Sequence, residues 1–218
     1  MARDLSLLVP EMTLVVAVVF ALVAEMLRAP RVALVLAILG MLLAAGLTLP
    51  VLDAATTVFG GTYRIDLLSG WAKLILLPGA ALALLMARAE LARSDREGTV
   101  YSLLGLVTTG ALMLAGAGDM MLIVLGVLLS GLGSFALVAY PRDDPATEAA
   151  MKFFVFASVT GAIMIYGLSL WFGGTGSTLL SELSRLETMP VVAAAGLVAV
   201  LVGLGYKAAL VPFHFWAP

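Results

Sequence analysis

The chain has 218 residues, of which 62% are apolar and 12% charged, and its mean hydropathy is +1.12. Soluble globular domains are about 45–50% apolar and about 25% charged, so this composition excludes a water-soluble enzyme and indicates a polytopic membrane protein. The net charge of −2, without a polybasic cluster, indicates no nucleic-acid partner. With no cysteine and one histidine, His214, the chain offers no thiolate-ligated metal site and no haem held by two histidines.

Apolar runs between charged or Gly/Pro-rich connections predict an all-α bundle of about seven transmembrane helices. The first run is long enough to span and lacks the pattern of a cleaved signal peptide, so it is predicted to be retained. No soluble domain is visible, and residues 1–218 are predicted to form a single integral membrane domain. The expected spans are about 6–27, 32–51, 68–88, 99–117, 119–140, 149–172 and 190–216.

Three connecting segments carry local signals. Residues 53–67 contain Gly60–Gly61 and are predicted to form a small hairpin. Asp119 opens the fifth span, where a carboxylate favours a helix N-terminus. Residues 179–186 are predicted to form a short helix at the membrane surface. Glu11 lies near the outer end of the first span, and its position alone indicates no function.

The distribution of basic residues predicts the orientation. The loops after the first, third and fifth spans hold Arg28, Arg31, Arg88, Arg93, Arg96, Arg142 and Lys152. The opposite side holds only Arg3, Arg64 and Arg185. The positive-inside rule therefore predicts an external N-terminus.

Two lysines, Lys73 and Lys207, lie inside apolar runs. A lysine at bilayer depth costs at least about 2.5–3.5 kcal/mol on insertion scales, so it persists where it faces protein or water. Lys73 is close enough to the start of its span for an alternative, in which its amine extends to the lipid headgroups. Lys207 has long uncharged stretches on both sides, so extension of its amine to the lipid headgroups is a weaker explanation for this residue.

Each of these lysines is followed five residues later by a proline, Pro78 or Pro212. Proline lacks an N–H and its ring displaces the carbonyl four residues earlier, so we expect helix breaks at Pro78 and Pro212, the latter in the seventh span. A lysine, a freed carbonyl and water together would form a proton-relay site. The alternative is that both prolines are ordinary kinks without proton transfer.

Several segments resemble subunit N of bacterial NADH:quinone oxidoreductase, respiratory complex I, an antiporter-like membrane-arm subunit. They include GLGYKAALVPFHFWAP at 203–218, EAAMKFFVF at 148–156, LVAYPRDD at 137–144 and LLVPEM at 7–12. The family's subunit is far longer than this chain, so the resemblance covers the N-terminal half of an antiporter-like unit. The chain is expected to be either a fragment or a retained part of such a subunit.

The resemblance implies a proton channel built from inverted repeats with broken helices. Lys207 matches the family's seventh-helix lysine, Lys152 the lysine at the start of the sixth helix, and Lys73 the one common in the third. The glutamate that pairs with the seventh-helix lysine is expected at position 128, where this chain has Leu128. Gly126 and Ser130 instead indicate a small-residue face for close helix packing. Both a residual proton path through Lys207 and a non-conducting structural role therefore remain open.

The resemblance also implies a location and partners. We expect a multi-pass protein of the bacterial inner membrane, in contact with the lipid bilayer and other membrane-arm subunits of complex I. This chain would act as a subunit of the translocase without binding a cofactor, with NADH, FMN, iron–sulfur clusters and quinone on other subunits. The alternatives are a subunit of a related cation/proton antiporter or membrane-bound hydrogenase, and a non-conducting membrane scaffold.

Overall fold

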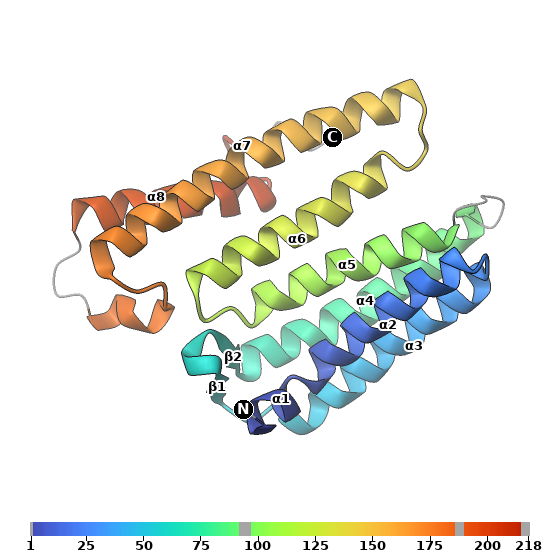
Figure 1. Cartoon of the computed structure of the whole chain (residues 1–218), viewed down its shortest axis with the longest axis horizontal. Helices are drawn as coiled ribbons and strands as arrows, with labels where there is room; N and C mark the ends of the chain where they lie inside the picture. Colours follow the sequence, from blue (N-terminus) through green and yellow to red (C-terminus); the bar gives the residue numbers. More distant parts are fainter. Residues whose placement is uncertain (1, 92–96, 186–189, 215–218) are drawn as a thin grey trace.

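The computed structural model describes residues 2–91, 97–185 and 190–214, and it is a bundle of apolar helices (Figure 1). Within these described ranges, six helices are long and apolar enough to cross a membrane, and a seventh apolar helix, α8, is shorter. This agrees with the predicted helical bundle. The helices are α1 Ala2–Leu7, α2 Val9–Met26, α3 Pro30–Thr48, α4 Leu67–Leu91, α5 Glu97–Ala115, α6 Met120–Val138, α7 Asp144–Thr175 and α8 Val191–Lys207.

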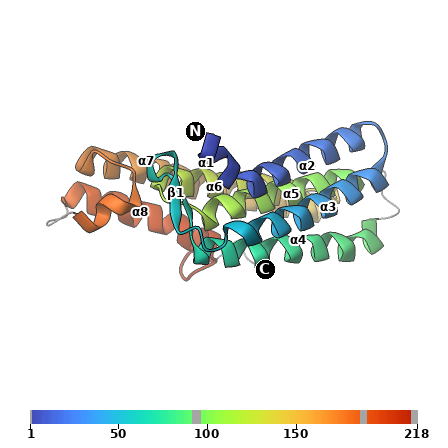
Figure 2. The same cartoon turned by 90° about the horizontal axis from the view of Figure 1, so that it is seen from below.

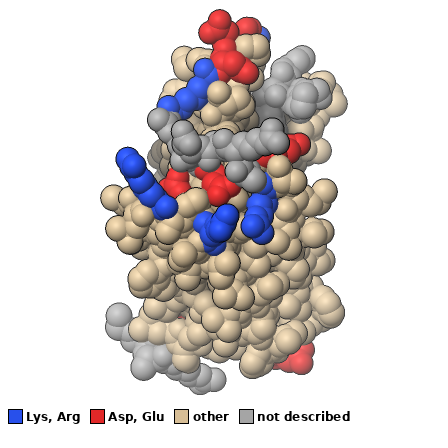
Figure 3. Space-filling model, turned by 90° about the vertical axis from the view of Figure 1, so that its right-hand side faces the viewer, with Lys and Arg blue, Asp and Glu red and all other residues tan. Residues whose placement is uncertain are grey.

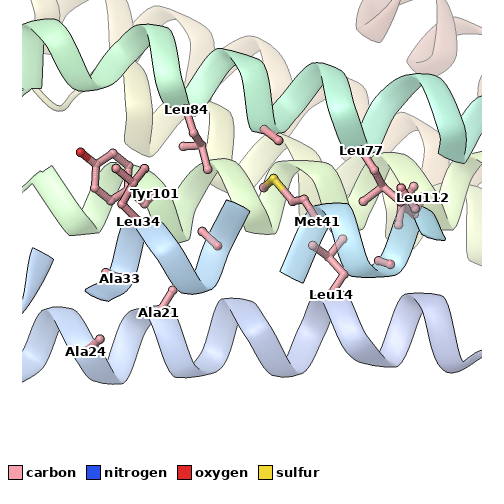
Figure 4. Close-up of a cluster of buried hydrophobic side chains, with 14 residues drawn as sticks. Leu14, Ala21, Ala24, Ala33, Leu34, Met41, Leu77, Leu84, Tyr101 and Leu112 are labelled. Atoms are coloured by element: carbon pink, nitrogen blue, oxygen red, sulfur yellow. The ribbon is translucent and has the colours of Figure 1, made fainter. Parts of the chain in front are cut away.

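The helices run side by side along the long axis of the molecule, with α2 to α5 grouped together, α6 beside α5, and α7 packed on α8 (Figures 1 and 2). The largest apolar core lies among α2, α3, α4 and α5 (Figure 4). Its members include Leu14, Met41, Leu77 and Leu84, which are fully buried. This core holds four helices together and surrounds the segments that carry Glu11 and Lys73.

Residues between α3 and α4 form the predicted hairpin, which is confirmed. Strand β1, Thr56–Val58, pairs antiparallel with β2, Tyr63–Ile65. The turn between them contains Gly60 and Gly61, whose positive φ angles of 68° and 98° favour glycine. A short 3-10 helix, η1 Leu49–Val51, precedes the hairpin, and another, η2 Phe59–Gly61, connects its strands. A third, η3 Leu180–Arg185, follows α7.

The hairpin is attached to the α5–α6 connection by backbone hydrogen bonds. Arg64 N–H donates to the Gly116 carbonyl at 2.7 Å, and Gly118 N–H donates to the Thr62 carbonyl at 2.9 Å. Asp119 caps α6 by accepting a hydrogen bond from Met121 N–H at 2.6 Å, which confirms its predicted place at a helix N-terminus. The hairpin is therefore a fixed part of this end of the bundle.

Charged side chains gather at the other end of the bundle, around the α2–α3 and α4–α5 connections (Figure 3). Arg28, Arg31 and Arg88 are exposed there. They are among the basic residues whose distribution predicts the orientation of the chain.

The two predicted helix breaks have different outcomes in the structure. The break expected at Pro78 is wrong, because α4 continues through Pro78 from Leu67 to Leu91. Membrane helices tolerate an internal proline where neighbouring groups and small backbone adjustments satisfy the freed carbonyl. Helix α8 does end early, at Lys207 rather than at the predicted residue 216, and it ends before Pro212 is reached.

The end of α8 is produced by a left-handed turn at Ala209. Ala209 has φ 52°, its N–H donates to the Tyr206 carbonyl at 3.0 Å, and Leu210 N–H donates to the Gly205 carbonyl at 2.8 Å. This pair of hydrogen bonds is the Schellman motif, which satisfies carbonyls at a helix C-terminus. Pro212 follows the end of the helix and prevents it from continuing.

Helices α5 and α6 approach closely at the small residues of α6. A Cβ atom added to Gly110 would lie 2.6 Å from the backbone nitrogen of Ser130 and 2.9 Å from the carbonyl oxygen of Gly126. Only glycine permits this backbone-to-backbone approach. The small-residue packing face predicted from Gly126 and Ser130 is therefore confirmed.

Candidate functional site

Lys207 is the last residue of α8, and its side chain is partly buried. It lines a cavity of about 210 Å³ between α6, α7 and α8, and Leu128 of α6 lines the same cavity. The structure therefore brings together the two positions that the resemblance pairs. It does so with a leucine in place of the carboxylate.

The walls of this cavity are mostly aromatic and aliphatic. Phe135 packs edge-on against Phe153 and Phe154, with ring centroids 6.3 Å and 5.3 Å away. Two of the lining hydroxyls are engaged with backbone, since Tyr206 donates to the Phe153 carbonyl at 3.3 Å and Thr160 to the Phe156 carbonyl at 2.8 Å. Such a pocket offers an amine little compensation beyond the water that it can hold.

Within the described parts of the chain, no carboxylate forms an ion pair with Lys207. A lysine amine at bilayer depth without a counter-charge is costly, and this cost is reduced by water or by loss of its proton. The cavity has room for water molecules beside the amine. Lys207 therefore lines a mostly apolar pocket and has no carboxylate partner among the described residues.

Lys73 lies in a second site, at the end of the bundle covered by the hairpin. Its side chain is 1% exposed, and its Nζ lies 2.5 Å from Glu11 Oε1. The alternative in which Lys73 extends to the lipid headgroups is therefore wrong. The amine is turned inward because a buried carboxylate on α2 offers it an ion pair that lipid cannot.

Tyr63, from strand β2, completes this site. Its hydroxyl donates a hydrogen bond to Glu11 Oε1 at 2.7 Å, and Lys73 Nζ lies 5.2 Å from the centre of its ring. Burial, together with the neighbouring Glu11 carboxylate, raises the pKa of Tyr63 well above its usual value. The phenol therefore stays protonated and acts as a donor to Glu11.

The sequence interpretation missed Glu11 and Tyr63. Neither position indicates a functional residue by its local pattern, because Glu11 is near a helix end and Tyr63 is in a turn-rich connection. One signal was present, since Glu11 and Lys73 are opposite charges within the first two turns of α2 and α4. Only the packing of the hairpin on these helices shows that they meet.

Lys152 lies on the surface of α7. Its Nζ is 2.5 Å from Glu148 Oε1 one helical turn earlier, and the two side chains are 67% and 68% exposed. It does not line the cavity of Lys207. The structure thus leaves the three lysines in three separate surroundings, and the role predicted for Lys152 stays a prediction.

The groups collected at these sites are amines, a carboxylate and a phenol, all of which exchange protons. Among the described residues, no group of three or more His, Asp or Glu side chains is placed to hold a metal ion. Titratable side chains are thus what the two sites have in common.

Comparison with known proteins agrees with this picture. Residues 117–218 match the family described as NADH:quinone oxidoreductase/Mrp antiporter, transmembrane. The chain is 37% identical over 232 aligned residues to NADH-quinone oxidoreductase subunit N of Desulfovibrio desulfuricans, an alignment that covers 99% of this chain and 45% of the relative. The chain thus spans about half the length of the curated relatives that it matches.

Solved structures share the fold. Respiratory complex I from Thermus thermophilus contains a chain that is 30% identical, with a TM-score of 0.82, over 96% of this chain and 46% of that one. A chain of the archaeal membrane-bound sulfane sulfur reductase has a TM-score of 0.85 at 19% identity, over 99% and 47% of the two chains, which shows a common fold. These findings confirm the resemblance drawn from the motifs: the chain is a multi-pass membrane protein related to the antiporter-like subunit N of NADH-quinone oxidoreductase.

Proposed function

We propose that this chain serves as an antiporter-like membrane-arm subunit of an NADH:quinone oxidoreductase and contributes part of a proton path through Lys207. The observation that carries this proposal is the cavity shared by Lys207 and Leu128 at the C-terminal end of α8. The cavity has room for water beside this helix end. A proton can be held and released by the amine in these surroundings.

The remaining parts of the proposal follow the family resemblance. Residues 1–218 would form one integral membrane domain of the bacterial inner membrane, with the N-terminus outside and the Arg-rich loops inside. Lys152 and Lys73 would be further groups of the path. NADH, FMN, iron–sulfur clusters and quinone would be bound by partner subunits of the membrane complex, and electron transfer would take place on those subunits.

The test replaces Lys207 in the complete complex. We expect Lys207→Met to lower the number of protons translocated per quinone reduced in reconstituted vesicles, because methionine keeps the shape of the side chain without a proton. The matched variant Lys207→Arg keeps the charge but does not release a proton near neutral pH, so it should be nearly as defective. An unchanged proton stoichiometry in Lys207→Met would refute the conducting role.

A second candidate is a non-conducting scaffold. Two observations favour it: Leu128 stands where a carboxylate is expected, and α6 packs on α5 through glycines. This role predicts normal function when Lys207 is replaced by leucine and when Lys73→Leu is combined with Glu11→Gln, since Lys73→Leu alone would leave Glu11 without its counter-charge. A related cation/proton antiporter is a third candidate, because the matched family description includes the Mrp antiporters. Sodium-dependent growth of the host would favour it.

A further inference from the structure

Glu11, Lys73 and Tyr63 form a largely buried cluster of titratable side chains. None of the three lines the cavity of Lys207. They come from α2, α4 and β2, so the cluster exists only when the hairpin packs on the helices. From α5, the backbone carbonyl of Leu112 lies 3.3 Å from the Tyr63 hydroxyl. The two titratable side chains with contacts to Glu11 in the described structure are thus Lys73 and Tyr63.

Both donors meet the same oxygen of Glu11. Lys73 Nζ and the Tyr63 hydroxyl lie 2.5 Å and 2.7 Å from Oε1. The other oxygen, Oε2, is buried, and none of the described residues donates a hydrogen bond to it. Leaving a buried carboxylate oxygen unpaired is costly, so Oε2 needs either a water molecule or a proton.

The cluster is arranged as an ion pair beside a neutral phenol. With Glu11 ionised, Lys73 charged and Tyr63 neutral, the charges of the pair cancel. The phenol cannot provide a second negative charge, because its burial beside Glu11 keeps it protonated. Its hydrogen bond also holds Oε1 in place, which leaves Oε2 as the acceptor.

We propose that Glu11 Oε2, held in place by Lys73 and Tyr63, is a proton-accepting site of this chain that is distinct from the Lys207 cavity. This inference rests on the proposed function, because the protons exchanged here would be those that the chain conducts. It assigns a carboxylate to a chain that lacks the one expected at position 128. That carboxylate lies on α2 and pairs with the lysine of α4.

The proposed step conserves charge and atoms. A hydronium ion in the surrounding water transfers a proton to Oε2: an O–H bond of the hydronium breaks, an O–H bond forms at Oε2, a water molecule is left, and the carboxylate becomes a neutral acid. Lys73 is then a buried cation without a counter-charge, which is an unfavourable state. The cluster returns to neutrality when one proton leaves to water, either by breaking the O–H bond at Oε2 or by breaking an N–H bond of Lys73.

The test compares single and double variants in the complete complex. The variants are Glu11→Gln, Lys73→Met and the two combined, and Glu90→Gln is the control because Glu90 is exposed near the end of the helix that carries Lys73. Protons translocated per quinone reduced are measured in membrane vesicles. The amount of assembled complex is measured in the same membranes.

A proton-accepting role and a purely structural ion pair give different results. If Glu11 accepts protons, Glu11→Gln loses proton translocation per quinone and the double variant stays as low. If the pair only holds helices together, each single variant loses assembled complex, and the double variant recovers both assembly and translocation because no buried charge is left unpaired. Recovery in the double variant, or unchanged translocation in Glu11→Gln, would overturn the proposal.

Infrared spectroscopy gives a second readout. It does not depend on how much complex the variant Lys73→Met assembles. On acidification, the wild-type complex should gain a carbonyl band of a protonated carboxylic acid that shifts in Tyr63→Phe and is missing in Glu11→Gln. A band that is the same in all three proteins would count against the site. Lys207→Met separates the two proposals. Lower proton translocation per quinone in Lys207→Met, with normal translocation in Glu11→Gln, rejects this inference alone. Normal translocation in Lys207→Met rejects the proposed function.

Discussion

The ammonium of Lys73 on α4 lies 2.5 Å from the carboxylate of Glu11 on α2, in the buried interior of the bundle. This ion pair and the Lys207 cavity place the two lysines of the apolar runs in separate regions. In one region a lysine has its carboxylate, and in the other the carboxylate position is occupied by Leu128.

Restoring a carboxylate beside Lys207 should strengthen proton transfer. We expect Leu128→Glu to place a carboxylate in the cavity of Lys207, so that the pair shares a proton as coupled groups do, and to raise the protons translocated per quinone reduced. The control is Leu125→Glu, because Leu125 lies on the same helix, is 44% exposed and does not line the cavity. Equal pumping in Leu128→Glu and the wild type would mean that the missing carboxylate does not limit the path.

Removing the cap of α4 should destabilise the protein. Asp66 Oδ1 accepts a hydrogen bond from Ser69 N–H at 2.8 Å, and Ser69 Oγ accepts one from Asp66 N–H at 3.0 Å, which is a capping box. We expect Asp66→Ala to lower the free energy of unfolding by about 1 kcal/mol, measured by denaturation in detergent. Asp53→Ala, in the exposed connection before the hairpin, should have a much smaller effect.

The same cap should weaken in acid. The hydrogen bond from the Ser69 backbone N–H is the main cause that lowers the pKa of Asp66. A carboxyl with a lowered pKa stabilises the folded state above its unfolded pKa, and this contribution is lost as the pH falls through the lowered value. The stability difference between wild type and Asp66→Ala should therefore shrink on acidification below the ordinary aspartate range. A difference that stays constant with pH would contradict this assignment.

A glycine at the end of α8 should stabilise the turn after Lys207. Ala209 has φ 52°, a left-handed conformation that costs a residue with a Cβ atom about 1–2 kcal/mol. Ala209→Gly should raise the free energy of unfolding by about 1 kcal/mol, measured in detergent. Ala208→Gly, at φ −86°, gains no such relief and should be neutral or destabilising. If the two variants behaved alike, the left-handed turn would not limit stability.

A methyl group at Gly110 should separate α5 from α6. The added Cβ would meet backbone atoms of Ser130 and Gly126 at 2.6 Å and 2.9 Å, and backbone cannot move aside as a side chain can. We expect Gly110→Ala to destabilise by about 1–3 kcal/mol. The control is Gly79→Ala within α4, where a Cβ has no neighbour within 4 Å and alanine improves helix propensity. Thermal unfolding of the two variants should shift in opposite directions.

The sequence by itself determined the class of protein and most of its helices. Apolar runs of bilayer length exclude a soluble fold, because their surface can only be hidden in lipid or inside a bundle. Local signals were enough for the hairpin at Gly60–Gly61 and for the cap at Asp119, since turns and caps depend on neighbouring residues. The motif around Lys207 was enough to indicate the family.

The tertiary structure decided which charges meet. The continuity of α4 through Pro78 and the ending of α8 at Ala209, before Pro212, depend on how neighbouring segments satisfy backbone groups. Glu11 and Lys73 are far apart in the chain, and no periodicity links them. Their pairing follows from the three-dimensional packing of α2, α4 and the hairpin, which buries Lys73, leaves Glu11 16% exposed and makes each the other's counter-charge.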